Sequence, residues 1–154
     1  MADTLRILFL CTGNACRSQM AEAWARTILG GVVQPASAGV VATAVDPRAQ
    51  QVMQEAGVDL SGQFSKKLDE LESLDFDYVI TLCDHAAQHC PIFPGTATLV
   101  HRPFEDPPLA TQGMSEEAAI LAVYRRVRDE IREFVGHIPE NLGPRQEIAP
   151  PRLF

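Results

Sequence analysis

The residues best suited to chemistry lie between Cys11 and Arg17, in the stretch CTGNACR. A loop of small residues can turn successive backbone N–H groups inward, and a helix that starts there adds partial positive charge. Such a loop binds a tetrahedral oxyanion, and the Arg17 guanidinium supplies a fork of donors for two of the oxygens. The expected oxyanion site consists of Thr12, Gly13, Asn14, Ala15, Cys16 and Arg17.

Cys11 is the expected nucleophile of this loop. The helix start and the neighbouring Arg17 favour a thiolate over a thiol, and Ser18 can donate a hydroxyl hydrogen bond to the sulfur. A thiolate that faces a bound anion is poised for attack. The spacing of Cys16 to Cys11 fits no common zinc pattern, so packing is the expected role of the Cys16 side chain. The simpler alternative is a buried cysteine at a strand end followed by an exposed arginine.

A second cluster, CDHAAQHC, spans Cys83 to Cys90 and follows a predicted strand directly. In a parallel sheet this strand end lies at the same edge as the Cys11 loop. In a helix the two cysteines would be about 10 Å apart along the axis, whereas a disulfide needs Cα atoms within about 7 Å. Their pairing therefore requires a redox-dependent rearrangement. The alternatives are a zinc site that adds His85 and His89, and two unconnected cysteines beside surface histidines.

The stretch FEDP contains a candidate general acid, Asp106, with Glu105 as a second carboxylate beside it. Expelling hydroxide or alkoxide from a tetrahedral oxyanion is easier when a proton is placed on the leaving oxygen. The alternative is that Asp106 and Pro107 only start a turn. In the first loop, Asn14 suits a position that needs a left-handed backbone.

Composition limits the classes of protein. The length of 154 residues, 46% of them apolar, fits one domain with one core. A net charge of −7 argues against nucleic acid and anionic membranes as partners, although a small oxyanion can still bind through local donors. Four cysteines are too few for a disulfide scaffold. Without a long apolar stretch or a signal-peptide pattern, the expected location is the cytoplasm.

Several elements are predicted to position these residues. Apolar runs predict strands over residues 5–10, 78–82 and 97–100. Apolar periodicity predicts a helix over residues 18–29, and Asp46 and Pro47 start another that ends at Gly57. Ser115 is expected to cap a long helix whose apolar stripe is Ile120, Val123, Val127, Ile131 and Phe134. The alternation predicts an α/β fold with a parallel sheet, followed by an extended tail after Gly136.

The segment CTGNACRSQMAE resembles the phosphate-binding loop of the low-molecular-weight tyrosine phosphatase superfamily, which contains phosphatases and thioredoxin-coupled arsenate reductases. The resemblance runs from about residue 5 to residue 134. It implies a single domain with a four-stranded parallel sheet flanked by helices, with residues 1–136 as the catalytic domain and 137–154 as the tail.

Three features resemble the reductase branch. The first is the pair Cys83 and Cys90, with Cys90 in the stretch CPI. The second is Gln19, where phosphatases usually carry proline. The third is that no aromatic residue follows Pro107. The resemblance implies that Cys11 attacks arsenate while Asp106 protonates the departing oxygen, and that disulfides then form from Cys11 to Cys83 and from Cys83 to Cys90. A low-molecular-weight phosphatase and a non-catalytic oxyanion or metal-thiolate binding protein remain the alternatives.

The resemblance also implies supporting groups and partners. Asn14, Glu22 and Ser37 form a polar cluster under the loop, which in some reductases helps hold potassium; Lys66 stands here in place of an acidic ligand, so no potassium dependence is expected. No bound cofactor or resident metal is expected. Thioredoxin is the expected reductant, with glutaredoxin and glutathione as the alternative, phosphate and sulfate should mimic arsenate, and the protein is expected to be a monomer.

Overall fold

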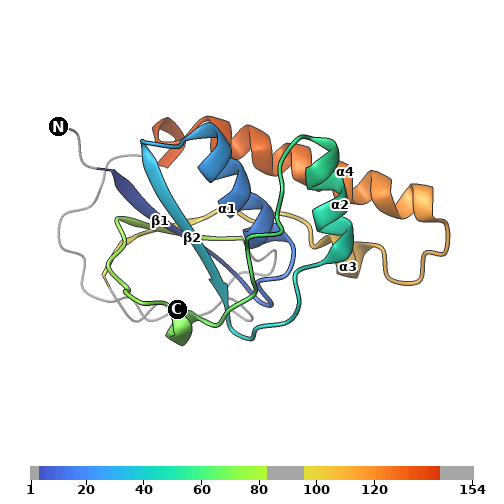
Figure 1. Ribbon diagram of the computed structural model, residues 1–154, viewed down its shortest axis with the longest axis horizontal. Helices are drawn as coiled ribbons and strands as arrows, with labels where there is room; N and C mark the ends of the chain where they lie inside the picture. The colour runs from blue at the N-terminus through green and yellow to red at the C-terminus, as the bar shows by residue number, and fades with distance from the viewer. Residues whose placement is uncertain (1–3, 83–95, 143–154) are drawn as a thin grey trace.

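The structure is a computed structural model that describes residues 4–82 and 96–142, so Cys83 and Cys90 lie outside the described residues. Its elements in chain order are β1 (Leu5–Cys11), α1 (Arg17–Ile28), β2 (Val33–Gly39), α2 (Pro47–Glu55), η1 (Leu68–Glu70), β3 (Tyr78–Thr81), β4 (Thr98–His101), α3 (Pro107–Ala110), α4 (Glu117–Gly136) and η2 (Glu140–Leu142). The four strands form one sheet in the order β2-β1-β3-β4, and every pair is parallel. The expected α/β fold with a four-stranded parallel sheet is confirmed (Figure 1).

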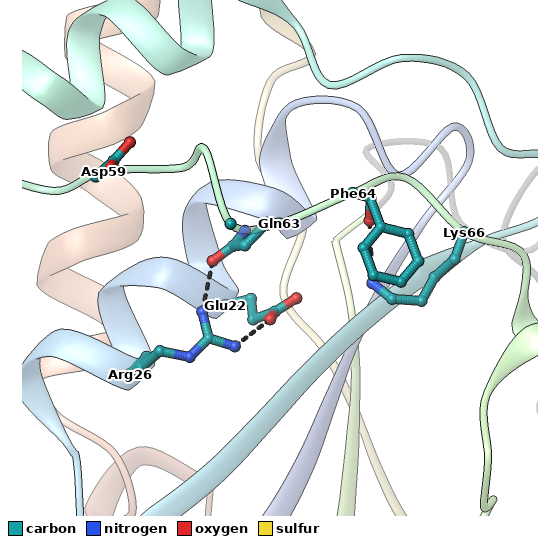
Figure 2. A pocket seen from close by; sticks show the side chains of 7 residues that line it. Glu22, Arg26, Asp59, Gln63, Phe64 and Lys66 are labelled. Atoms are coloured by element: carbon teal, nitrogen blue, oxygen red, sulfur yellow. Dashed lines mark hydrogen bonds and ion pairs between the residues drawn. The ribbon is translucent and has the colours of Figure 1, made fainter.

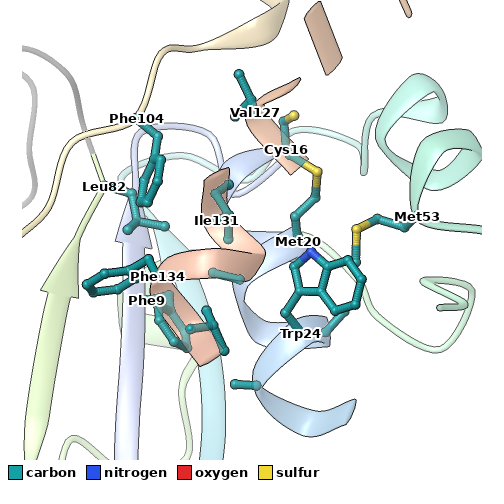
Figure 3. Packing of buried hydrophobic residues seen from close by; sticks show 14 of the residues in the cluster. Phe9, Cys16, Met20, Trp24, Met53, Leu82, Phe104, Val127, Ile131 and Phe134 are labelled. Carbon is teal, nitrogen blue, oxygen red and sulfur yellow. The ribbon is translucent and has the colours of Figure 1, made fainter. Parts of the chain in front are cut away.

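Strand β1 lies at the centre and is buried on both faces. Ile7 and Phe9 pack into the main core with α1, α2 and α4, whereas Leu8 and Leu10 face a smaller cluster that includes Phe76 and leucines from residues 68–74. Burial on both sides explains the continuous apolar run, because neither face of a covered parallel strand meets water. Figure 3 shows Phe9 within the main core, among side chains of α1 and α4.

The predicted helices are largely confirmed. α1 occupies nearly the predicted range, and α2 begins after Asp46, whose carboxylate accepts a hydrogen bond of 2.9 Å from the Arg48 backbone N–H. The prediction for α4 was wrong at its start, because the cap residue is Glu116, one residue after Ser115. No helix within the described ranges has the length and apolar character needed to cross a membrane.

The buried face of α4 also differs in part from the predicted stripe. Tyr124 and Leu121 are buried there, while Val123 is only half-buried. Tyr124 is 2% exposed, and its hydroxyl donates a hydrogen bond of 2.6 Å to Asp46. Burial and the Asp46 carboxylate raise the pKa of Tyr124, so the phenol stays protonated and remains a donor. This contact fixes α4 to the start of α2.

Strand β2 is not apparent from its own residues, VQPASAG, which have low strand propensity apart from the valine. It lies at the edge of the sheet, where a proline is tolerated because one side of the strand has no neighbour to receive an N–H. Pro35 is paired with Ile7 in the parallel register.

After α4 the chain remains in contact with the core. Ile138 and Leu142 are 3% and 7% exposed and belong to the main apolar cluster. Residues 137–142 therefore pack against the domain where an extended tail was expected, and residues 143–154 lie outside the described part of the chain.

The end of β2 touches the loop after β1 directly. A Cβ atom on Gly39 would lie 2.7 Å from the Thr12 carbonyl oxygen, 2.9 Å from the Asn14 nitrogen and 3.0 Å from the Cys11 carbonyl oxygen. All three are backbone atoms, which cannot rotate away as a side chain can. The lack of a side chain at Gly39 is thus a condition for the conformation of the loop.

We expect Gly39→Ala to lower the free energy of unfolding by about 1–3 kcal/mol, because the loop or β2 must shift to admit the methyl group. The matched control is Gly62→Ala, since a Cβ there meets no atom within 4 Å. Chemical denaturation of both variants tests this. Equal stability of the Gly39→Ala and Gly62→Ala variants would contradict the close contact between Gly39 and the loop.

Candidate active site

The loop between β1 and α1 is held by its carbonyl groups. The Thr12 oxygen accepts backbone hydrogen bonds of 2.9 and 3.1 Å from Val40 and Val41. The Gly13 oxygen accepts from the Thr43 backbone at 3.3 Å, from the Thr43 hydroxyl at 3.2 Å and from the Ser65 hydroxyl at 3.0 Å.

The next two carbonyls of the loop are bound in the same way. The Asn14 oxygen accepts from the Gln19 amide at 2.9 Å, and the Ala15 oxygen accepts from the Asp46 backbone N–H at 2.9 Å. In a trans peptide the N–H points opposite to the C=O. Four outward carbonyls in succession therefore turn the N–H groups of residues 13–16 toward the inside of the loop, which makes a concave anion-binding nest.

The Cys11 thiol lies at the base of this nest and is buried. Its Sγ is 2.8 Å from the Ser18 hydroxyl oxygen, and the Asn14 side-chain amide donates to the same oxygen at 2.8 Å. Asn14 has a φ of 50°, the left-handed conformation that its residue type tolerates. The structure thus brings Cys11, Asn14 and Ser18 into one hydrogen-bonded group.

The side chain of Cys16 points away from the nest and into the main core, near Met20 and Val127 (Figure 3). Burial, followed by the nearby Asp46 and Asp106 carboxylates, raises the pKa of the Cys16 thiol well above its ordinary value. Cys16 is therefore a neutral packing residue, and only its backbone faces the nest.

Arg17 connects three segments at the carboxyl edge of the sheet. Its guanidinium donates hydrogen bonds of 3.1 Å to the Leu82 carbonyl and 3.0 Å to the Phe104 carbonyl, and lies 3.6 Å from the Asp106 carboxylate. The Arg17 side chain is 6% exposed and that of Asp106 is 29% exposed. The candidate acid thus stands at the rim of the nest, beside the residue expected to bind the anion.

The neighbouring carboxylate, Glu105, is bound by Arg126 of α4 and is half exposed. Arg126 also binds Glu130 at 2.9 Å on the same helix. This network gives Glu105 a structural partner on α4, so Asp106 is the carboxylate next to Arg17.

Of the expected supporting cluster, Ser37 and Glu22 are in direct contact, whereas the Asn14 side chain binds Ser18 and the Lys66 backbone N–H. The Ser37 hydroxyl donates a hydrogen bond of 2.5 Å to Glu22, and Arg26 forms an ion pair with the same carboxylate. The Lys66 ammonium binds the Phe64 carbonyl at 3.1 Å and lies 4.7 Å from the centre of the Phe64 ring (Figure 2). Burial lowers the pKa of Lys66, and Glu22 opposes that shift. Arg26 is therefore the cation in contact with Glu22, with Lys66 a second one nearby.

Within the described ranges, no group of three or more histidine, cysteine, aspartate or glutamate side chains could hold a metal ion. The candidate zinc ligands Cys83, His85, His89 and Cys90, and with them the second thiol pair, lie outside those ranges.

Sequence reasoning missed the residues that hold the loop from outside. The residues that contact it from 25 to 52 positions away are Gly39, Thr43, Asp46 and Ser65. Asp46 was predicted only as the start of a helix, and no local pattern marks any of the four as a partner of the loop. Gln63 is a further such residue, because its amide donates a hydrogen bond of 2.7 Å to Gln19 in α1.

Known proteins resemble this chain along most of its length. An arsenate reductase of Halalkalibacterium halodurans is 49% identical over 125 residues, which cover 81% of this chain and 88% of that protein. A solved structure of an arsenate reductase in the phosphate-binding state has a TM-score of 0.71 at 34% identity and covers 90% of this chain and 96% of its own. A thioredoxin-dependent arsenate reductase of Corynebacterium glutamicum has a TM-score of 0.58 at 28% identity, over 86% of this chain and 61% of that one.

The family model of the low molecular weight phosphotyrosine protein phosphatases matches residues 6–146. This range includes the nest, Arg17 and Asp106 as well as the four strands apart from Leu5. The chain therefore belongs to the low molecular weight phosphotyrosine protein phosphatase family.

Proposed function

We propose that this protein is an arsenate reductase in which the thiols of Cys11, Cys83 and Cys90 pass two electrons to arsenic. Arsenate binds in the nest, where the inward N–H groups and Arg17 neutralise its charge. The Cys11 thiolate attacks arsenic, and Asp106 donates a proton to the oxygen that leaves as water.

In the second step Cys83 attacks the Cys11 sulfur. The sulfur–arsenic bond breaks, its electron pair stays on arsenic, and arsenite leaves with arsenic reduced from the pentavalent to the trivalent state. Cys90 then attacks Cys83, which restores the Cys11 thiolate and leaves a Cys83–Cys90 disulfide. A dithiol reductant of the thioredoxin type returns the pair to thiols, and glutaredoxin with glutathione is the alternative.

The observation that carries the proposal is the place of Leu82 in the sheet. Strands β1 and β3 are neighbours, with Leu10 paired to Thr81, and the Leu82 N–H donates a hydrogen bond of 2.9 Å to the Leu10 carbonyl. Adjacent strands are about 4.8 Å apart, so the residue before Cys83 lies beside Cys11. A phosphatase needs no second thiol at that point of the chain.

The names of the relatives support the same choice, since the proteins similar to this chain include arsenate reductases, one of them thioredoxin-dependent. We infer that residues 1–136 carry the catalytic groups and that residues 137–154 follow as a C-terminal segment, of which 137–142 pack on the core. We also infer that the protein works as a monomer in the cytoplasm, where thioredoxin keeps thiols reduced. A low-molecular-weight phosphatase is the second candidate, because the first chemical step is shared.

Cysteine variants test the electron relay. Cys83→Ser is expected to abolish multiple-turnover reduction of arsenate, measured as NADPH consumption with thioredoxin and thioredoxin reductase, while hydrolysis of an aryl phosphate continues. Cys90→Ser should stop turnover after one arsenite per enzyme, and Cys11→Ser should abolish both activities. Full arsenate turnover by Cys83→Ser would refute the relay, and substitution of glutaredoxin and glutathione in the same assay identifies the reductant.

The acid is tested by Asp106→Asn, which keeps the shape and removes the proton donor. We expect kcat for arsenate reduction to fall by about 100- to 10,000-fold. The matched control is Glu105→Gln at the neighbouring carboxylate, which is bound by Arg126 and should retain activity. An equal loss in both variants would argue against a specific role of Asp106.

The cation under the loop is tested with salts. Because Arg26 pairs with Glu22 and Lys66 adds a second positive charge nearby, kcat/KM should be the same in potassium chloride and sodium chloride at equal ionic strength. Choline chloride serves as a control for ionic strength alone. A rate stimulated specifically by potassium would contradict this prediction.

A further inference from the structure

A continuous series of side-chain hydrogen bonds leads from the surface of α1 to the nucleophile. Its outer half begins at Arg26, whose guanidinium donates a hydrogen bond of 2.7 Å to the Gln63 side-chain oxygen (Figure 2). The Gln63 amide nitrogen then donates at 2.7 Å to the side-chain oxygen of Gln19. Gln19 lies in α1 and is fully buried.

The inner half continues in the same direction. The Gln19 amide nitrogen donates at 3.0 Å to the side-chain oxygen of Asn14, and the Asn14 amide nitrogen donates at 2.8 Å to the Ser18 hydroxyl oxygen. The Ser18 oxygen is 2.8 Å from Cys11 Sγ. We call Gln63, Gln19 and Asn14 the amide series.

The direction of the amide series is set by groups that cannot reverse their roles. A guanidinium only donates, so Gln63 must present its oxygen to Arg26 and its nitrogen to Gln19. The backbone fixes the same order, because Gln19 also donates to the carbonyls of Asn14 and Phe64, at 2.9 and 3.1 Å, and carbonyls only accept. The Lys66 backbone N–H donates at 2.9 Å to the Asn14 side-chain oxygen, which turns the Asn14 nitrogen toward Ser18.

This fixed direction determines how the Ser18 hydroxyl, which has a single hydrogen, can bond. Its oxygen accepts from Asn14, so its one hydrogen is available for the Cys11 sulfur at 2.8 Å. Toward a Cys11 thiolate the hydroxyl must be the donor, because a thiolate has no hydrogen to give. A hydrogen bond donated to a sulfur favours the thiolate over the thiol. Asn14, Ser18 and Gln19 are all fully buried, so water cannot replace a missing donor.

We propose that Gln19 and Gln63, oriented from outside by Arg26, are positioning residues that make Ser18 a donor to the Cys11 thiolate. They act on the sulfur through Asn14 and Ser18. The proposal rests on the role of Cys11 as nucleophile in the proposed function, and it adds to that function a path by which Gln63 affects ionisation of the thiol.

The test measures Cys11 itself. The pH dependence of its alkylation by iodoacetamide, followed by peptide mass spectrometry on the reduced full chain, gives the midpoint of thiolate formation. Gln19→Met removes the donor to Asn14 and keeps the length of the side chain. We expect it to raise the midpoint by about one pH unit, a tenfold change in the ionisation equilibrium. Gln63→Met acts one link further out and should raise it less.

Two controls separate positioning from general loss of structure. Gln50→Met makes the same substitution at an exposed glutamine of α2 and should leave the midpoint unchanged. Val52→Ala opens space in the core at a fully buried position of α2 and should lower stability without moving the midpoint. A midpoint unchanged in both Gln19→Met and Gln63→Met, or moved equally by Val52→Ala, would overturn the proposal. If Gln19→Met fails to fold, Gln63→Met, at a half-buried loop position, decides it.

A double-mutant cycle identifies the path. Ser18→Ala alone should raise the midpoint, and adding Gln19→Met should then change it no further, because the effect of Gln19 passes through the Ser18 hydroxyl. Additive shifts would show that Gln19 acts by another route and would refute the series. Because alkylation needs no arsenate, failure of this test is distinct from failure of arsenate turnover, which is measured separately.

Discussion

The arrangement of the site depends on where the Arg17 guanidinium is held. Its hydrogen bonds to the Leu82 and Phe104 carbonyls tie the first turn of α1 to the segments that follow β3 and β4, and its ion pair reaches Asp106. A guanidinium is planar and always charged, so these contacts together fix the orientation of its plane. The strand ends, the acid and the oxyanion donor thus share one rigid reference point at the carboxyl edge of a parallel sheet, the usual place for ligands in such folds.

The nest is shaped from outside as much as from within. Three of its carbonyls are bound by residues 40–46 and 65, and the Asn14 carbonyl is bound by Gln19 of α1. Gly39 leaves no space for a wider turn. The C=O and N–H of one peptide point in opposite directions. When the C=O is hydrogen-bonded on the outside of the loop, the N–H therefore points inside. The cost of arranging donors around an anion is met during folding, so little rearrangement is needed when the anion binds.

Much of the fold was predictable, for identifiable reasons. The continuous apolar run of β1 and the Asp46–Pro47 start of α2 are local signals, and both predicted elements are confirmed. β2 was not predictable from its residues, since it is stabilised as an edge strand by its pairing with β1. The start of α4 was predicted one residue early because Ser115 is a typical cap residue, yet the chain begins its helical turn after Glu116.

The candidate site divides in the same way. The loop from Cys11 to Arg17 is contiguous, so its pattern is visible in the sequence, whereas its partners Gly39 and Gln63 are brought to it only by the fold. The pairing of Glu22 with Arg26 has the i, i+4 spacing of a helical ion pair and was available from sequence. The expectation instead emphasised Lys66, which is bound to the Phe64 carbonyl.

The first nine residues of α1, from Arg17 to Ala25, are all buried. The helix that carries Arg17 is therefore also a main part of the hydrophobic core. One short helix must both position the anion-binding side chain and pack the interior. Redesign of this scaffold for another oxyanion has little freedom within α1. The freer positions are exposed side chains outside α1, such as Val40, Val41 and Leu109, which take no part in the proposed chemistry.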